Sequence, residues 1–353
     1  MGKTNIEWAH YTVNAWTGCS KISPACKNCY AEHDTPVRVV EHQLAKQLDA
    51  PIVGLKIRLP MWGGHDKRTG EGYRVETVGW EKRLRALNRK AHSNRVDHNN
   101  RALRLPAGTP SPFGRYERPR VFINSLSDTF ESFEGPIYRK QNGRFEIVAN
   151  SLDDVRRRLF AVIEECTELD VLLLTKRPEN VKWEAPPHWY IAKWPSHVWI
   201  GTTVENQEMA DRRIPELLRI PARVRFLSME PLLGEVDLER HLWQKWEPSR
   251  GPIRNSSGDV VPMSSTGHIH WVIVGGESGP NARPMHPNDA RKIRDQCQAA
   301  GVPFFFKQWG EHGPRREAVN MSPPYRFKER MVRVGKRNAG RLLDGREWNE
   351  VPK

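Results

Sequence analysis

The sequence predicts an α/β fold, a partial (β/α) barrel, from three observations. From about residue 119 onward, short apolar runs rich in β-branched and aromatic residues alternate with stretches of helical pattern. These runs are nearly unbroken, as expected of parallel strands that are covered on both faces. Each run ends in polar residues, and the carboxyl ends of barrel strands are where ligands bind and chemistry occurs.

The expected elements follow one another at regular intervals. A first strand is predicted within residues 4–13. Six further runs, each a strand with the polar residues after it, span residues 120–128, 170–180, 197–207, 224–234, 270–279 and 302–311. Helical patterns span residues 146–169, 205–220 and 288–301, and Gly301 is a typical helix stop. Strands that alternate with helices at this spacing imply right-handed crossover connections.

Two segments depart from this repeat, residues 34–118 and a stretch rich in Ser, Gly and Pro over residues 245–268 that we interpret as a loop. Residues 34–118 hold a Gly-rich stretch and then many basic residues, and we interpret them as an irregular inserted segment and a candidate substrate lobe. The predicted organisation is residues 1–33 with the first strand and the cysteine loop, 34–118 as the insertion, 119–311 as the βα repeats, and 312–353 as a basic C-terminal extension. The basic residues of the insertion are Lys82, Arg83, Arg85, Arg89, Lys90, Arg95, Arg101 and Arg104.

The charge of the chain indicates a polyanionic partner. The formal net charge is +14 and the isoelectric point is near 9.7, which favours nucleic acid, DNA first. The tail beyond residue 312 interleaves Arg and Lys with aromatic residues, and such a surface suits phosphates and stacked bases. A generally basic protein with a solvated tail is the alternative.

The cellular location is predicted from what the sequence lacks. No apolar run approaches the ~20 residues that a membrane-spanning helix needs, and no apolar stretch follows a basic N-terminus. The five cysteines are an odd number, and a chain of 353 residues can bury a core without disulfides. We therefore expect a soluble protein in a reducing, cytoplasmic compartment.

The strongest local signal is the cysteine loop WTGCSKISPACKNCYAEH, residues 16–33. Cys19, Cys26 and Cys29 have the spacing Cys-x6-Cys-x2-Cys, and Gly18 and Pro24 supply turns. Three thiolates on a compact loop are typical of a soft-metal centre. Because a fourth cysteine is absent from the loop, an iron–sulfur cubane bound here would leave one iron open to another ligand.

The cysteine loop also suits a structural zinc. Cys19, Cys26 and Cys29 together with His33 would make a legitimate tetrahedral site. A third reading is that the three thiols are simply buried, although buried cysteines rarely cluster in this way. The position of the loop after the first strand, at the rim where the polar strand ends meet, favours the cluster because a structural zinc has no need to lie there.

Polar side chains at the strand ends form the second candidate site. They are Ser125, Ser127, Asp128, Lys176, Arg177, Thr202, Thr203, Glu205, Ser228, Glu230, Glu277, Ser278, Lys307 and Gln308. Because the carboxyl ends of parallel strands meet at one rim, we expect these groups to face a shared pocket. For any single member, a role as a helix cap or in a solvated turn accounts for the residue equally well.

Seven motifs in order resemble a phage- and prophage-associated three-cysteine-motif family of the radical SAM superfamily. They are WTGCSKISPACKNCYAE, INSLSDTF, LLLTKRPEN, WIGTTVEN, FLSMEPLLG, WVIVGGESG and FFKQWGE. The resemblance implies a [4Fe–4S] cluster on Cys19, Cys26 and Cys29, with S-adenosyl-L-methionine on the fourth iron and an electron donor such as flavodoxin or ferredoxin. One-electron cleavage of that ligand would give a 5′-deoxyadenosyl radical that abstracts a substrate hydrogen.

This chain departs from the superfamily pattern in two places. The first cysteine gap is six residues rather than three, and Asn28 stands where an aromatic residue usually precedes the third cysteine, although Tyr30 follows it. The Gly-Gly-Glu sequence that usually follows the second strand is found at residues 275–277 instead.

The departures shape the predicted roles of the rim residues. By position, Ser127 and Asp128 are candidates for the amino group of S-adenosylmethionine, and Thr202, Thr203 and Glu205 for its ribose or carboxylate. Further rim positions complete the set of candidates. They are Glu277 for cofactor binding, and Glu230 and Lys307 for catalysis.

The charge and the resemblance together predict modification or rearrangement of a nucleobase in phage DNA. The most specific hypothesis is an isomerase in thymidine hypermodification that moves an aminoacyl substituent from N-linkage to C-linkage, and so protects viral DNA from host restriction. A radical SAM nucleic-acid repair lyase and a non-catalytic, zinc-stapled nucleic-acid-binding protein are the alternatives. A phage-encoded enzyme of this kind would act in the host cytoplasm.

Overall fold

The computed structural model of this chain describes residues 4–49, 52–53, 56–57, 61–64, 72–103, 116–242, 268–320 and 326–352. Its main element is a seven-stranded sheet with the order β1-β6-β9-β10-β11-β12-β13. The strands are β1 (Tyr11–Val13), β6 (Arg120–Ile123), β9 (Asp170–Thr175), β10 (Val198–Thr203), β11 (Arg225–Met229), β12 (Trp271–Gly275) and β13 (Phe304–Gln308).

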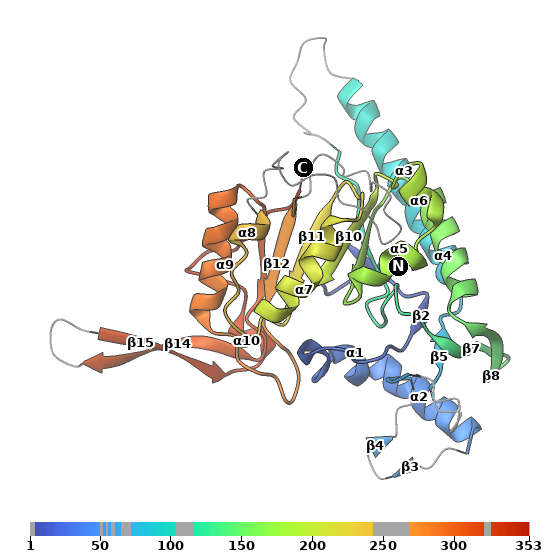
Figure 1. The fold of residues 1–353 in the computed structure, drawn as a ribbon, viewed down its shortest axis with the longest axis horizontal. Helices are drawn as coiled ribbons and strands as arrows, with labels where there is room; N and C mark the ends of the chain where they lie inside the picture. The colour runs from blue at the N-terminus through green and yellow to red at the C-terminus, as the bar shows by residue number, and fades with distance from the viewer. Residues whose placement is uncertain are drawn as a thin grey trace, which may run out of the picture. The chain divides into compact units, whose positions relative to one another are not determined.

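The strand pairing confirms the predicted fold class. β1 pairs with β6, β6 with β9, β10 with β11, β11 with β12, and β12 with β13, all in parallel. Every residue of β10, β11 and β12 is buried, as the unbroken apolar runs predict. The fold is α/β, a partial (β/α) barrel (Figure 1).

The chain packs into two compact units. Unit 1 comprises residues 1–20, 31–173 and 183–199, and unit 2 comprises residues 21–30, 174–182 and 200–353. The boundaries predicted after residues 33, 118 and 311 followed composition rather than packing, and they stay predictions.

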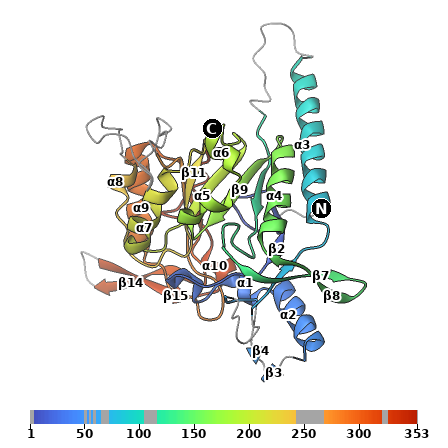
Figure 2. The same cartoon turned by 45° about the vertical axis from the view of Figure 1, so that its right-hand side comes forward.

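Unit 1 holds the elements of the predicted insertion, and the expectation of an irregular segment there is wrong. Two helices, α2 (Thr35–Gln47) and α3 (Trp80–Leu103), occupy much of residues 34–118. Short strands β3 (Ile52–Val53), β4 (Lys56–Ile57) and β5 (Arg74–Glu76) lie between them. The long helix α3 runs beside α4 (Asp153–Glu165) in Figure 2.

A second, four-stranded sheet also belongs to unit 1. Its order is β2-β5-β7-β8, where β2 is Trp16–Thr17, β7 is Glu134–Gln141 and β8 is Arg144–Ser151. The helix predicted over residues 146–169 therefore starts too early, because residues 144–151 are strand. The turn between β7 and β8 is Asn142-Gly143, both with positive φ, and this dipeptide is the usual signal of a tight hairpin.

The helices of unit 2 agree better with the sequence. The helix α7 (Gln207–Leu218) begins after Asn206, whose side chain accepts a hydrogen bond from the backbone N–H of Met209 at 3.0 Å. The helix α9 (Pro287–Ala300) ends at Gly301 in the left-handed conformation, as predicted. The smaller helices of the chain are α1 (Tyr30–His33), α5 (Val181–Glu184), α6 (Pro187–Ile191), α8 (Glu239–Leu242) and α10 (Lys336–Ala339).

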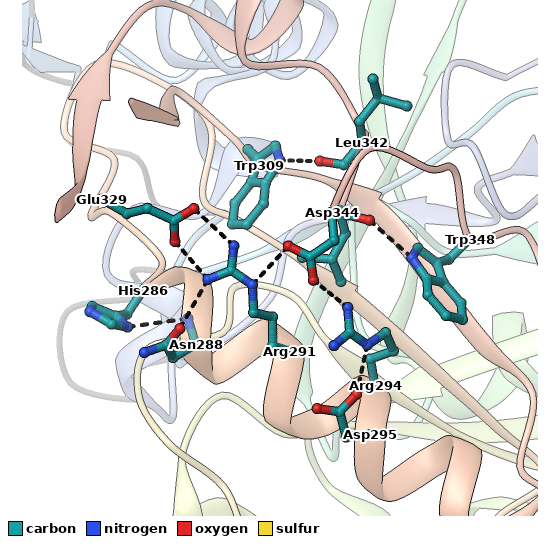
Figure 3. A network of polar contacts seen from close by, with 11 residues as sticks. His286, Asn288, Arg291, Arg294, Asp295, Trp309, Glu329, Leu342, Asp344 and Trp348 are labelled. Carbon is teal, nitrogen blue, oxygen red and sulfur yellow. Dashed lines mark hydrogen bonds and ion pairs between the residues drawn. The ribbon is translucent and has the colours of Figure 1, made fainter. Parts of the chain in front are cut away.

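The basic C-terminal extension is an ordered part of unit 2. It forms the antiparallel hairpin of β14 (His312–Asn320) and β15 (Arg326–Arg333). Arg291 of α9 binds Glu329 of β15 through both carboxylate oxygens, at 2.6 and 3.0 Å, and also binds Asp344 (Figure 3). Residues 348–350 then cover the edge of β13, where the N–H of Phe306 donates to the carbonyl of Trp348 at 2.9 Å.

Among the described residues, the structure has no helix that is long and apolar enough to cross a membrane.

Candidate metal and cofactor site

The three clustered cysteines are divided between the two units. Cys19 belongs to unit 1, and Cys26 and Cys29 belong to unit 2. None of them forms a disulfide.

In unit 1, the backbone before Cys19 is fixed by a close approach. Gly18 has φ of 108°, and a Cβ added there would lie 2.7 Å from the carbonyl oxygen of Met61. The N–H of Cys19 donates to the same carbonyl at 3.0 Å. Only glycine fits this conformation at this distance, so Gly18 sets where the cysteine loop begins.

A buried ion pair supports the same part of the loop. Arg74 of β5 binds both carboxylate oxygens of Glu131, at 3.0 and 2.9 Å, and donates to the carbonyl of Met61 at 3.0 Å. Glu131 in turn accepts the N–H of Ser20 at 2.6 Å. Arg74 is fully buried, so this pair is part of the scaffold of the loop. The sequence did not reveal either residue, because neither stands in a recognisable local pattern.

Ser127 and Asp128, predicted to bind the cofactor, make local contacts in unit 1. The Ser127 hydroxyl donates to the carbonyl of Trp16 at 3.0 Å, and Ser127 also forms a parallel bridge with Gly18. Asp128 is buried and accepts the N–H of Phe130 at 3.0 Å. Both residues therefore lie beside the start of the cysteine loop, and their role toward a cofactor stays a prediction.

In unit 2, the segment 21–30 is anchored by Glu205, which follows β10. Cys26 ends a short 3-10 helix, Pro24–Cys26. The N–H of Ala25 donates to one oxygen of Glu205 at 3.3 Å. The other oxygen accepts from Arg213 of α7 at 2.8 Å, and both side chains of this pair are almost completely buried.

A second carboxylate, Glu277 after β12, holds the other side of the segment. Glu277 accepts from the Asn28 amide at 3.0 Å and from the Arg283 guanidinium at 2.9 Å. Arg283 also donates to the carbonyl of Pro24 at 3.0 Å. Burial raises the pKa of Glu277, but the hydrogen bonds from Arg283 and Asn28 outweigh it and the pKa is lowered. The carboxylate is thus held ionised between the loop and its own arginine.

These contacts give Glu205 and Glu277 a positioning role that the sequence did not predict. Asn28 occupies the place of the expected aromatic residue, and its side chain ties the loop to Glu277 and to the carbonyl of Asn281 at 2.8 Å. A sequence signal did exist for Arg213. It lies within the otherwise apolar buried face of α7, where a charged side chain requires a buried partner.

The thiol of Cys26 is in an environment that favours the thiolate. Burial raises its pKa, but the Lys176 ammonium, hydrogen bonds from the backbone of Ile22 and Ser23, and the Ser23 hydroxyl outweigh burial, so that the pKa is lowered. Lys176 directly follows β9. A lowered thiol pKa increases the fraction of the form that ligates metals.

Four further rim candidates of unit 2 are of two kinds. Thr202 is buried and its hydroxyl donates to the carbonyl of Thr175 at 2.9 Å, while the carbonyl of Thr203 accepts from Arg213 at 2.9 Å. These contacts bind neighbouring elements together. Glu230 and Lys307, the candidate catalytic pair, form an ion pair at 2.8 Å with both side chains only slightly exposed.

Ser228 extends this pair, because its hydroxyl donates to the second oxygen of Glu230 at 3.2 Å. A Cβ at Gly275 would lie 3.0 Å from the first oxygen. The structure thus brings Ser228, Glu230 and Lys307 together at the carboxyl ends of β11 and β13, as their sequence positions predict.

The chemistry of the donors fits an iron–sulfur cluster, because the three thiols are free and at least Cys26 favours the thiolate. Among the described residues, no group of three or more His, Cys, Asp or Glu side chains is gathered closely enough to hold a metal ion. His33, the fourth ligand of the zinc alternative, is an exposed residue of α1 in unit 1. Which metal the cysteines bind stays a prediction.

Comparison with known protein families gives a match over nearly the whole chain. A family model described as "Protein of unknown function (DUF5131)" matches residues 3–352. No curated protein matches the chain, and no solved structure does.

Proposed function

The chain belongs to the DUF5131 family, whose description leaves the function open, and we propose that it is a radical SAM enzyme that modifies a nucleobase in DNA. In this proposal Cys19, Cys26 and Cys29 hold a [4Fe–4S] cluster. S-adenosylmethionine binds to the iron that no cysteine ligates. The most specific version remains the isomerase in phage thymidine hypermodification, with flavodoxin or ferredoxin as electron donor.

One observation carries the proposal: the segment with Cys26 and Cys29 is fastened to the carboxyl ends of two parallel strands by buried carboxylates. Glu205 after β10 and Glu277 after β12 accept hydrogen bonds from Ala25 and Asn28 of this segment. The carboxyl ends of barrel strands are where cofactors and substrates bind in folds of this class. A loop used only for structural zinc would not need to be held there.

A cluster held on Cys19, Cys26 and Cys29 would supply the electron for cleavage of the sulfonium to a 5′-deoxyadenosyl radical. The residues of this chain have other tasks. Lys176 favours the thiolate of Cys26, Arg213 and Arg283 orient the two anchoring carboxylates, and Arg283 helps to lower the pKa of Glu277. The Glu230–Lys307 pair offers a carboxylate and an ammonium within hydrogen-bond reach of each other, which suits proton transfer to a substrate.

The charge of the protein supports nucleic acid as the substrate. Beyond the net charge of +14, the hairpin β14–β15 places Arg315 directly opposite Arg330, and both are exposed. Like charges at directly opposed positions destabilise a sheet. Among the described residues neither arginine has an ion-pair partner, so a bound polyanion would relieve their repulsion.

The cofactor is tested by anaerobic reconstitution of the purified protein with iron and sulfide. We expect a brown protein with about four irons and four sulfides per chain, and 5′-deoxyadenosine after addition of S-adenosylmethionine and dithionite. Cys26→Ala should lose both properties. Cys297→Ala is the matched control, because Cys297 is a buried free cysteine of α9, and it should keep both. One zinc per chain and no colour would contradict the proposal and favour the non-catalytic, zinc-stapled nucleic-acid-binding protein.

The substrate is tested by repeating the reaction with DNA from a phage that carries hypermodified thymidine and with unmodified DNA. We expect 5′-deoxyadenosine to increase only with the modified DNA, and digestion to nucleosides to show an isomer of unchanged mass. A mass loss that restores an ordinary base would instead favour the repair lyase. An increase with neither DNA would contradict nucleic acid as the substrate.

A further inference from the structure

The long helix α3 of unit 1 has three distinct faces. Its buried face is formed by Leu84, Leu87 and Ala91. At 100° per residue, Arg85 and Arg95 lie to one side of this face, and the rest of the exposed surface, from the back of the helix round to the other side, carries further basic residues. The charged residues of α3 can therefore be separated into those that form ion pairs within unit 1 and those that do not.

The flank is fixed by ion pairs to the segment at the end of α4. Arg85 binds Glu165 through two nitrogens, at 2.6 and 3.1 Å. Arg95 binds Glu168 through two nitrogens, at 2.7 and 2.8 Å. Such bidentate pairs are the geometry in which an arginine positions a helix, so these two residues are accounted for by the structure.

This remaining surface carries the α3 basic stripe, defined here as Lys82, Arg83, Arg89 and Lys90. All four residues are exposed. Among the described residues, none of the four side chains has a hydrogen bond or an ion pair. Ala86 and Ser93 complete the same face, and no acidic residue occurs on it within the first four turns. Four cations without partners are therefore presented together on a rigid support.

We propose that the α3 basic stripe binds the sugar-phosphate backbone of the DNA substrate. The inference deepens the proposed function and rests on it. Lys82 and Lys90 are eight residues apart, which is about 12 Å along a helix. Duplex DNA carries one phosphate charge per ~1.7 Å of its axis, so this length offers about seven charges to the stripe.

A hollow beside the stripe gives the backbone a place to lie. A cavity of about 420 Å³ is lined by Asn88, Arg89, His92, Ser93, Thr167 and Glu168. Arg89 belongs to the stripe, and Asn88, Ser93 and Thr167 add neutral hydrogen-bonding groups. The one acid in the lining, Glu168, is already bound by Arg95 and contacted by His92 at 3.2 Å, so its charge is offset on the side of the helix.

The test measures the affinity of the whole protein for a short fluorescent DNA duplex between about 50 and 200 mM salt, the range over which phosphate contacts strongly alter affinity. The variants are Lys82→Gln/Arg83→Gln and Arg89→Gln/Lys90→Gln. Each should reduce the slope of log affinity against log salt by about two, because one phosphate contact contributes about 0.9. Since all four side chains are exposed, folding should not change.

The matched control, Arg157→Gln/Arg219→Gln, also removes two positive charges from the surface. Both arginines are exposed but paired within their own segments, with Asp154 and Glu216, and the control should keep the wild-type slope. A wild-type slope in both stripe variants would overturn the inference and leave the proposed function standing.

Two further outcomes would overturn both the inference about the α3 basic stripe and the proposal that nucleic acid is the substrate. One is a wild-type protein that does not bind the duplex. The other is a wild-type protein that binds phosphatidylserine vesicles but not DNA, which would assign the stripe to a membrane surface. Loss of slope in the stripe variants without 5′-deoxyadenosine formation would support the stripe while contradicting the radical chemistry.

Discussion

At the scale of single residues, the two carboxylates at the strand ends matter through the loop that they hold. Glu205 and Glu277 each connect an arginine of unit 2 with the backbone or side chain of the cysteine segment. Neither carboxylate is free to move, because each is bound from both sides. In the proposed function, these carboxylates would therefore act on the cofactor through the position of Cys26 and Cys29.

Removal of the Glu205 carboxylate should loosen the cysteine segment. In Glu205→Ala, Arg213 remains buried without its partner, which costs about 3–5 kcal/mol in the free energy of unfolding. Urea unfolding measures this loss, and hydrogen exchange should become faster in residues 21–30. Glu208→Ala is the control, because Glu208 is an exposed residue of α7, the helix that carries Arg213. Unchanged exchange in residues 21–30 would contradict the anchoring role.

The pH dependence of Cys26 reactivity follows from its surroundings in the metal-free protein. Its pKa is lowered from the usual 9.0, so the thiolate forms at a lower pH than in an ordinary cysteine. Alkylation of Cys26 by iodoacetamide, followed by mass spectrometry, should therefore rise with pH through a midpoint below 9.0. Lys176→Met removes the positive charge that most lowers the pKa of Cys26, so the midpoint should move upward.

Two other cysteines serve as internal references in this experiment. Burial, reinforced by Glu165, raises the pKa of Cys166 to about 12, and burial raises the pKa of Cys297. Both thiols should stay unmodified over the same pH range. A Cys26 midpoint that Lys176→Met leaves unchanged would exclude the ammonium as the cause.

At the scale of elements, the hairpin β14–β15 is held to the rest of unit 2 by Arg291 of α9 and by Arg333 of β15, which donates to the carbonyls of Gly279 and Pro280. Arg291 binds Glu329 of β15 and Asp344 together, as Figure 3 shows. These groups are about a quarter exposed, at 22% for Arg291 and 25% for Glu329. Such pairs contribute little to global stability, so their effect should be local.

Arg291→Met should therefore loosen the hairpin around Glu329 without unfolding the protein. We expect faster hydrogen exchange in residues 312–333 and a thermal midpoint close to that of the wild type. Lys292→Met is the control, because Lys292 is exposed and pairs with Glu235 instead. Equal exchange in the two variants would show that other contacts attach the hairpin.

At the scale of the whole molecule, the sequence predicted what local patterns encode. Buried parallel strands require unbroken apolar runs, so the sheet and the polar residues at its carboxyl ends were found. The helix α3 was missed because its apolar face, with Leu84, Leu87 and Ala91, is narrow among many basic residues, and because it is stabilised by Glu165 and Glu168 in a distant part of the chain. The Asn142-Gly143 dipeptide is a sequence signal for the hairpin of β7 and β8, and it conflicts with a helix that begins at residue 146.

The site shows the same division. The cysteines were found from their spacing, whereas Arg74, Arg213 and Arg283 were not, because their importance lies in contacts that cross long stretches of sequence. Glu205 and Glu277 were correctly placed at the rim, but the sequence did not reveal that the loop itself is their partner.

The contacts of the cysteine segment also indicate when this segment folds relative to the rest of the chain. Ala25 meets Glu205 across 180 residues of chain, and Asn28 meets Glu277 across 249. Contacts of such long separation form late, because a large loop must close first. The segment reaches its final position only once β10 and β12 exist. In the proposed function, a cluster would therefore be inserted only after synthesis has passed these two strands.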